Sequence, residues 1–251
     1  MFENIEKPFF AMMPKYIRHY YYFKKLGNLG FPEMINLEDT NACNASCTMC
    51  PREKLNRPIG IMDFGLYKKL IDECSGRIEL KEMHLNGFGE SLLDEGIAEK
   101  ISYAKKKGLK RVYFVTNASL LTASVAEGII KAGLDGIKFS IYGITKESYD
   151  KIHRGLNFDV TEENIINFFK LRETLGFKRP YIKMQFISQD ANRGERELFF
   201  RKWSKFINRK TGDTLLDFKI HNWADGRAYN KKMGSEKFKS CALPFFCAQV
   251  L

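Results

Sequence analysis

The chain has 251 residues, 44% of them hydrophobic and 14% aromatic, and its 41 basic and 30 acidic residues leave a formal charge of +11 at pH 7. This length and composition suit one large buried core and exclude a disordered chain. The charge is compatible with a nucleic acid, an anionic membrane or an acidic protein partner, but the Lys and Arg residues are scattered, which favours a solvated basic surface.

Residues 1–30 form a segment that is rich in aromatic and basic side chains. Phe9 and Phe10 are followed by an aromatic run at positions 20–23 beside Lys24. Such a segment can lie on a membrane surface, but we expect its rings to pack on the protein body. It lacks the apolar run and cleavage site of a secretory signal, and no part of the chain offers the ~18 apolar residues of a membrane span. We therefore expect a cytoplasmic protein without a transmembrane segment.

From residue 33 onward, short apolar runs alternate with longer amphipathic stretches. The runs predict six strands, at Glu33–Leu37, Glu82–Asn86, Arg111–Thr116, Gly136–Ile141, Tyr181–Ile187 and Leu216–His221. The stretches predict five helices, at Asp63–Cys74, Asp94–Lys107, Ala123–Ala132, Glu162–Leu175 and Glu195–Asn208. Repetition of strand, helix and strand favours an α/β fold with a parallel sheet and helices outside it. Six units are too few for a closed eight-unit barrel but suit an open, partial (β/α)6 TIM-like barrel, and a doubly wound sheet is the alternative.

Capping residues indicate where several of these helices begin and end. Gly108, Gly133 and Gly176 each follow the last periodic residue of a helix, where the left-handed backbone of a C-cap favours glycine. Thr122 and Thr161 stand at predicted N-caps, where a hydroxyl accepts a hydrogen bond from a free backbone N–H.

The residues with the most distinctive chemistry follow the predicted strands. A cluster of cysteines follows the first strand, Gly87–Glu90 follows the second, Thr116 and Asn117 end the third, and Ser140–Gly143 ends the fourth. In barrels and in doubly wound sheets, functional residues gather at the carboxyl ends of the strands. The sequence therefore predicts one functional site at that edge of the sheet.

The six cysteines are unevenly placed along the chain. Cys43, Cys47 and Cys50 follow the spacing C-x3-C-x2-C, whereas Cys74 stands alone on a predicted helix, where we expect it to be part of the core. In a reducing compartment, clustered cysteines bind metal more often than they form disulfides. Three thiolates can hold three irons of a [4Fe–4S] cube and leave the fourth iron open. They cannot complete a tetrahedral zinc site alone, so the zinc alternative has to borrow another cysteine or a histidine.

A C-x3-C-x2-C loop after the first strand of a βα barrel resembles the signature of the radical S-adenosylmethionine (SAM) superfamily. The resemblance implies a [4Fe–4S] cluster on Cys43, Cys47 and Cys50, whose open iron binds the amino and carboxylate groups of SAM. It also implies reductive cleavage of SAM to a 5′-deoxyadenosyl radical, which abstracts a hydrogen atom from a substrate. In such enzymes the cofactor carries the chemistry, and the protein supplies placement and exclusion of water.

The same resemblance implies a set of SAM contacts. Gly87, Phe88, Gly89 and Glu90 stand where the superfamily has a Gly-Gly-Glu motif, with Phe88 in place of its first glycine, and Glu90 is expected to bind the ammonium group of SAM. Further contacts are implied for Thr116 and Asn117 near SAM or the substrate, for Ser140 at the ribose, and for Met49 inside the cysteine loop. Without the cysteines, Gly87–Glu90 is more typical of a simple turn, and Thr116 and Asn117 of a strand end.

Other segments complete the resemblance. His153–Gly155 is similar to a segment found in one subgroup, and Gln185 and His221–Trp223 are expected to face the active site. Cys241 and Cys247 resemble the opening of a C-terminal extension called SPASM, where further cysteines bind auxiliary iron–sulfur clusters. Two cysteines cannot hold such a cluster alone, so an auxiliary cluster is expected only in a longer chain. The expected domains are an N-terminal segment at 1–30, a barrel at 31–225, and the start of a truncated extension at 226–251.

The resemblance leaves two substrate classes open. One is modification of a peptide or protein, and the other is dehydrogenation of an alcohol on a sugar or aminocyclitol. A small acidic electron donor such as flavodoxin or ferredoxin is expected to dock on the basic surface. Two alternatives belong to other classes: a non-catalytic metal-binding module that contacts nucleic acid, and an inactive fragment of a longer enzyme. Nucleic acid is not the partner we expect.

Overall fold

A computed structural model describes residues 31–219 and 247–251, and seven strands of these residues form one parallel sheet. The strands are β1 (Met34–Leu37), β3 (Glu82–Leu85), β4 (Val112–Thr116), β5 (Gly136–Ser140), β7 (Tyr181–Ser188), β8 (Thr214–Lys219) and β9 (Cys247–Val250). Their order in the sheet is β8-β7-β5-β4-β3-β1-β9, and every neighbouring pair is parallel. The sheet is therefore an open, partial barrel, as predicted.

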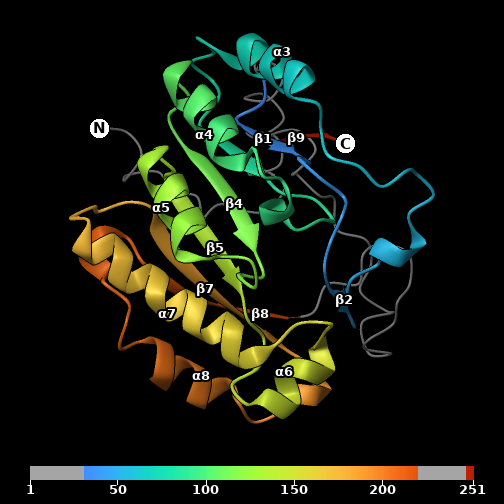
Figure 1. Cartoon of the computed structure of the whole chain (residues 1–251), viewed down its shortest axis with the longest axis vertical. Coiled ribbons are helices and arrows are strands. Elements are labelled where there is room, and N and C mark those ends of the chain that lie inside the picture. Colours follow the sequence, from blue (N-terminus) through green and yellow to red (C-terminus); the bar gives the residue numbers. More distant parts are fainter. Residues whose placement is uncertain (1–30, 220–246) are drawn as a thin grey trace, which may run out of the picture.

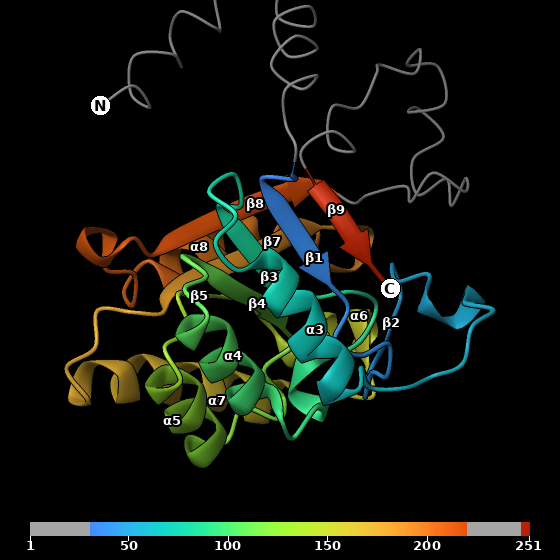
Figure 2. The same ribbon diagram turned by 90° about the horizontal axis from the view of Figure 1, so that it is seen from above.

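The helices lie along one side of this sheet (Figures 1 and 2). They are α3 (Phe64–Cys74), α4 (Ile97–Lys106), α5 (Ala123–Lys131), α6 (Lys146–Ile152), α7 (Phe158–Thr174) and α8 (Arg196–Trp203). Short 3-10 turns occur at Arg52–Lys54, Ser91–Leu93, Asp190–Asn192 and Arg209–Thr211. A second, two-stranded antiparallel ribbon joins β2 (Ser46–Cys47) to β6 (His153–Arg154). No helix in the described part of the chain is long and apolar enough to cross a bilayer.

The alternation of burial along the strands shows which face of the sheet the helices cover. In β1 and β3, half-buried and fully buried residues alternate without exception. The buried members pack with the helices into one core, to which the strands contribute Ile35, Leu37, Met83, Leu85, Phe114, Ile137, Phe139, Ile182, Met184 and Phe186. Each such side chain stabilises the fold by about 1.5–3 kcal/mol relative to an exposed one. The half-buried members form the opposite, inner face of the barrel.

Most of the predicted elements are confirmed. All six predicted strands are present, and the sheet gains a seventh, β9. All five predicted helices are present as well, whereas the sequence did not predict α6. Thr122 accepts a hydrogen bond from the Val125 N–H and caps α5, and Gly108, Gly133 and Gly176 adopt the expected positive φ angles. Cys74 is part of the core.

The predicted N-cap at Thr161 is wrong. Helix α7 begins at Phe158, and Asn157 is its N-cap because its side chain accepts a hydrogen bond from the Val160 N–H. Thr161 lies inside the helix, fully buried, where its hydroxyl accepts a hydrogen bond from the Tyr149 hydroxyl. Asn and Thr are both favoured at N-caps. The sequence therefore offered two N-cap candidates four residues apart, Asn157 and Thr161, and gave no local signal that separates them.

The last strand comes from the segment predicted as the start of the extension. β9 pairs with β1 in parallel, with Cys247 opposite Met34 and Val250 opposite Leu37. The end of the chain therefore belongs to the sheet of the barrel. The N-terminal segment 1–30, the residues His221–Trp223 and Cys241 lie outside the described residues.

Candidate functional site

The cysteine loop follows the carboxyl end of β1. Cys43, Cys47 and Cys50 are all half-buried, and the Cys50 N–H donates to the Cys47 carbonyl at 3.0 Å. Burial raises the pKa of Cys47 to about 12, and the charges of Cys43 and Cys50 contribute to this rise. Burial also raises the pKa of Cys43. The three thiols therefore lie within electrostatic reach of one another, and those of Cys43 and Cys47 are protonated unless a cation draws off their protons.

A histidine that the sequence did not assign to the site holds the central cysteine. The β2–β6 ribbon sets Cys47 opposite His153, and the Cys47 Sγ lies 3.3 Å from the His153 Nδ1. The other ring nitrogen, Nε2, accepts the backbone N–H of Tyr142 at 3.2 Å. Because Nε2 is the acceptor, the neutral ring carries its hydrogen on Nδ1 and donates it to the Cys47 sulfur. Complete burial lowers the pKa of His153 to about 3, which keeps the ring neutral.

The Glu90 carboxylate joins the loops after β3 and β4. It accepts hydrogen bonds from the Thr116 hydroxyl at 2.6 Å, from the Asn117 N–H at 2.7 Å and from the Leu92 N–H at 3.1 Å. The Asn117 side chain in turn donates to Asn44 of the cysteine loop at 2.9 Å. Burial raises the pKa of Glu90 despite these donors. The sequence-predicted residues Glu90, Thr116 and Asn117 thus form one network that reaches the cysteine loop.

The glycines before Glu90 allow this loop to lie against the cysteine loop. A Cβ at Gly89 would overlap the Thr40 carbonyl and stand 2.6 Å from the Ala42 carbonyl, which is closer than real side chains come. The Glu90 N–H donates to the same Ala42 carbonyl at 2.8 Å. Small residues in a loop allow a ligand or another segment of backbone to approach closely. At Gly89 it is the backbone of residues 40–42 that approaches.

Three more residues of the predicted site contact Tyr142. Ser140 hydrogen-bonds to Tyr142 at the end of β5, and the Gln185 side chain donates to the Tyr142 hydroxyl at 3.2 Å. Met49 is buried and packs with Tyr142 and Ile152 in a small cluster that Cys47 adjoins. That Gln185 faces the active site stays a prediction. Roles in binding SAM stay predictions for all of these residues.

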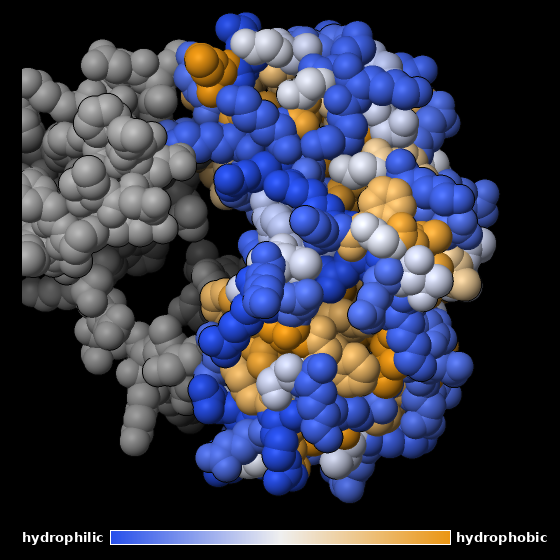
Figure 3. Space-filling model, turned by 90° about the vertical axis from the view of Figure 1, so that its left-hand side faces the viewer, coloured by the Kyte–Doolittle hydropathy of each residue, from blue (hydrophilic) through white to orange (hydrophobic). Residues whose placement is uncertain are grey.

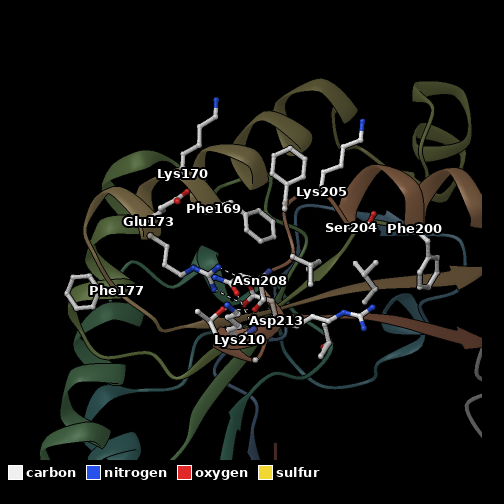
Figure 4. Close-up of a pocket in the computed structure, with 18 residues that line it drawn as sticks. Phe169, Lys170, Glu173, Phe177, Phe200, Ser204, Lys205, Asn208, Lys210 and Asp213 are labelled. Carbon is white, nitrogen blue, oxygen red and sulfur yellow. Dashed lines mark hydrogen bonds and ion pairs between the residues drawn. The ribbon is translucent and has the colours of Figure 1, made fainter.

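The described structure also contains a large hollow, but at the other edge of the sheet. It encloses about 1270 Å3 between α7, α8 and the segment that leads into β8 (Figure 4). Arg172 and Asp213 are among the residues that line it, and Arg172 donates two hydrogen bonds of 2.7 Å to Asp213. Because Asp213 precedes β8 while the cysteines follow β1, the hollow lies at the edge of the sheet where the strands begin.

Apolar patches interrupt an otherwise hydrophilic surface on the face that Figure 3 shows.

Within the described residues, no three His, Cys, Asp or Glu side chains are placed to share a single metal ion. The donor set of the cysteine loop is instead three thiols from one turn of chain, at the mouth of an open parallel barrel. Three thiolates with no fourth protein ligand are the set that a [4Fe–4S] cube with one open iron requires. The residues present therefore fit such a cluster.

Comparison with known proteins agrees with this class of fold and site. The model of the radical SAM superfamily matches residues 37–177, more than half of the chain, and the chain belongs to this superfamily. Two curated relatives are the tungsten-containing aldehyde ferredoxin oxidoreductase cofactor-modifying protein of Pyrococcus furiosus and the AdoMet-dependent heme synthase of Methanosarcina barkeri. The first is 28% identical over 62% of this chain and 44% of its own length. The second is 32% identical over 50% of this chain and 35% of its own length.

Solved structures show the same fold. SuiB of Streptococcus suis bound to S-adenosylmethionine superposes with a TM-score of 0.64 and 14% identity over 86% of this chain and 46% of that one. The SAM-bound anSMEcpe gives a TM-score of 0.59 and 18% identity over 76% and 52%. The predicted partial barrel and the predicted superfamily are thus confirmed. The chain spans less than half the length of the two curated relatives named above.

Proposed function

We propose that this chain is a radical SAM enzyme that holds a [4Fe–4S] cluster on Cys43, Cys47 and Cys50 and abstracts a hydrogen atom from its substrate. The observation that carries the proposal is the convergence of these three thiols in one loop at the carboxyl edge of the barrel. When bound, the cluster and SAM would supply the 5′-deoxyadenosyl radical.

The chain's own residues would position this chemistry. Glu90, Thr116 and Asn117 brace the loops around the cysteines, and Ser140 lies at the neighbouring strand end. Contacts with SAM are proposed for Met49, Gly87, Phe88, Gly89, Glu90, Thr116, Asn117 and Ser140. Because Glu90 is almost fully buried, an ammonium group bound to it would be shielded from water, which strengthens their attraction.

The substrate is proposed to be a peptide or a sugar-like alcohol. The peptide class has the support that SuiB was solved with its precursor peptide SuiA and anSMEcpe with a bound peptide. Both neighbours are less than 25% identical to this chain, so their fold alone is shared. In a longer chain, Cys241 and Cys247 could join further cysteines at an auxiliary cluster.

An electron donor is needed for reductive cleavage of SAM. The charge of +11 favours a small acidic protein such as flavodoxin or ferredoxin, because opposite charges steer association. A cytoplasmic location is proposed as well, because a reducing compartment keeps clustered thiols free to bind iron.

The first experiment measures 5′-deoxyadenosine from SAM with the full chain, reconstituted anaerobically with iron and sulfide and reduced with dithionite. We expect product and about four irons per chain, as the cube requires. Cys47→Ala should lose both. The matched control is Cys74→Ala, the same change at a buried cysteine of α3, which should keep both. Full iron content in Cys47→Ala would contradict the proposal.

A further inference from the structure

The inner face of the barrel carries two lysines side by side. Lys138 on β5 and Lys183 on β7 are register partners in the parallel ladder, and both belong to the half-buried set that faces away from the helices. Ser140 and Gln185 are also register partners, two residues further toward the carboxyl edge. At about 3.3 Å per residue, the lysines therefore lie roughly 7 Å deeper in the barrel than Ser140.

An aromatic floor lies against Lys183. Its Nζ lies 5.4 Å from the ring centroids of both Tyr113 and Tyr181, whose centroids are 5.2 Å apart. These rings meet across Gly136, where a Cβ would overlap Tyr113 and stand 2.8 Å from Tyr181. The cation therefore rests on two π faces that bear a partial negative charge, an arrangement that fixes its position without neutralising it.

Neither lysine has a carboxylate partner within the described residues. By contrast, Lys100 pairs with Asp94 and Lys105 pairs with Asp135, at 2.6 Å each. The acidic residue of the same face on β3, Glu82, is engaged by His84 and Arg111.

Two neighbouring ammonium groups without a counter-ion repel each other. Burial and, secondly, the charge of Lys183 lower the pKa of Lys138. An anion between the two amines would replace this repulsion with two charge-assisted hydrogen bonds. Both lysines also lie deeper in the barrel than the loops of the candidate SAM site. A substrate inside the barrel would be enclosed at this depth.

We propose that Lys138 and Lys183 form an anion-binding subsite that holds a carboxylate or phosphate group of the substrate inside the barrel. In naming the ligand a substrate, this inference rests on the proposed function. It narrows the substrate to an anionic molecule, either a peptide with an acidic side chain or terminus or a phosphorylated sugar.

The test is calorimetric titration of the full chain with glutarate, inorganic phosphate and pyrophosphate at low ionic strength. We expect at least one of these probes to bind. Lys138→Met and Lys183→Met should each weaken that binding about tenfold or more, because each removes a charge-assisted hydrogen bond. Lys138→Arg, which keeps the charge, should retain binding within a few-fold. The matched control is Lys131→Met, which removes a lysine that is 60% exposed on α5.

The probes also distinguish the sources of the anion. Tighter binding of the phosphates than of glutarate would assign a phosphorylated substrate, and the reverse would assign a carboxylate. The subsite would be overturned if both methionine variants bound the probes with unchanged affinity while keeping the far-UV circular dichroism of the wild type. An equal loss of affinity in Lys131→Met, or no binding of any probe by the wild type, would overturn it as well. These titrations need neither cluster nor SAM, so their failure is distinct from absence of 5′-deoxyadenosine, which would refute the proposed function instead.

Discussion

At the scale of single residues, the pairing of His153 with Cys47 links the fold to the redox properties of the site. The imidazole is fixed on both sides: Nε2 accepts the Tyr142 N–H, and Nδ1 lies 3.3 Å from the Cys47 sulfur. Its ring also stacks on Tyr149, with centroids 4.6 Å apart. Hydrogen bonds to cluster sulfurs are among the groups that set the potential of an iron–sulfur centre, because they favour the more negative, reduced state.

We therefore predict that His153→Phe lowers the reduction potential of the reconstituted cluster. Phenylalanine keeps a ring between Tyr142 and Tyr149 but donates no hydrogen bond. A hydrogen bond of about 1 kcal/mol corresponds to roughly 40 mV for one electron, so the shift should be of that order. Potentiometric titration followed by electron paramagnetic resonance measures it. Tyr149→Phe, which removes a hydroxyl from the same stack, is the control. Equal potentials in all three proteins would rule out this role for His153.

At the scale of elements, the close approach of the cysteine loop and the Gly87–Glu90 loop depends on one missing side chain. Gly89→Ala should destabilise the fold by about 1–3 kcal/mol, because its Cβ has no room beside the Thr40 and Ala42 carbonyls. Urea unfolding measures the loss. The control is Gly60→Ala, where no atom lies within 4 Å of the added Cβ. If both variants unfold at the same urea concentration, the two loops do not need this contact.

The elements also separate what the sequence could predict from what it could not. The six predicted strands and the position of the cysteine loop followed from apolar periodicity and from the rule that sites lie at carboxyl strand ends. The strand at Cys247–Val250 was missed because its partner, β1, lies more than 200 residues away and four residues carry little periodic signal. The β2–β6 ribbon has two residues on each side, so nothing local indicated that Cys47 and His153 meet.

At the scale of the whole molecule, sheet register decides which polar residues become neighbours. Lys138 and Lys183 are 45 positions apart in the sequence, and only the β5–β7 pairing sets them side by side. Periodicity of two predicts that each faces the barrel interior, but the ladder position of one strand against the next is a tertiary property. For the same reason, the hydrogen bonds that join Glu90 to Thr116 and Asn117 could not be predicted from the sequence. The candidate site was thus predictable as a set of residues but not as a network.

The free energy of unfolding of the whole protein should depend on pH through one buried carboxyl, that of Asp39, which follows β1. Its Oδ1 accepts the Ser91 hydroxyl at 3.0 Å, its Oδ2 has no hydrogen-bond partner within the described residues, and its side chain is nearly inaccessible. Burial raises the pKa of Asp39 from 3.8 to about 7, while the Ser91 hydrogen bond and the Lys100 charge oppose this rise. The folded state therefore holds a proton that the unfolded state has already released between these two pH values.

The sign of the pH dependence follows from this proton. The stability that protonated Asp39 contributes is complete below pH 3.8 and is lost as the pH rises through about 7. Asp39→Asn cannot titrate, so its free energy of unfolding should gain on that of the wild type by up to about 1.4 kcal/mol per pH unit below pH 7 and level off above it. Urea unfolding at pH 5, 6, 7 and 8 measures the difference. Asp190→Asn, at a carboxylate that is 92% exposed, should differ from the wild type by less than about 0.5 kcal/mol throughout. A constant difference between Asp39→Asn and the wild type would mean that Asp39 is ionised in the folded protein, with its charge neutralised by Lys100.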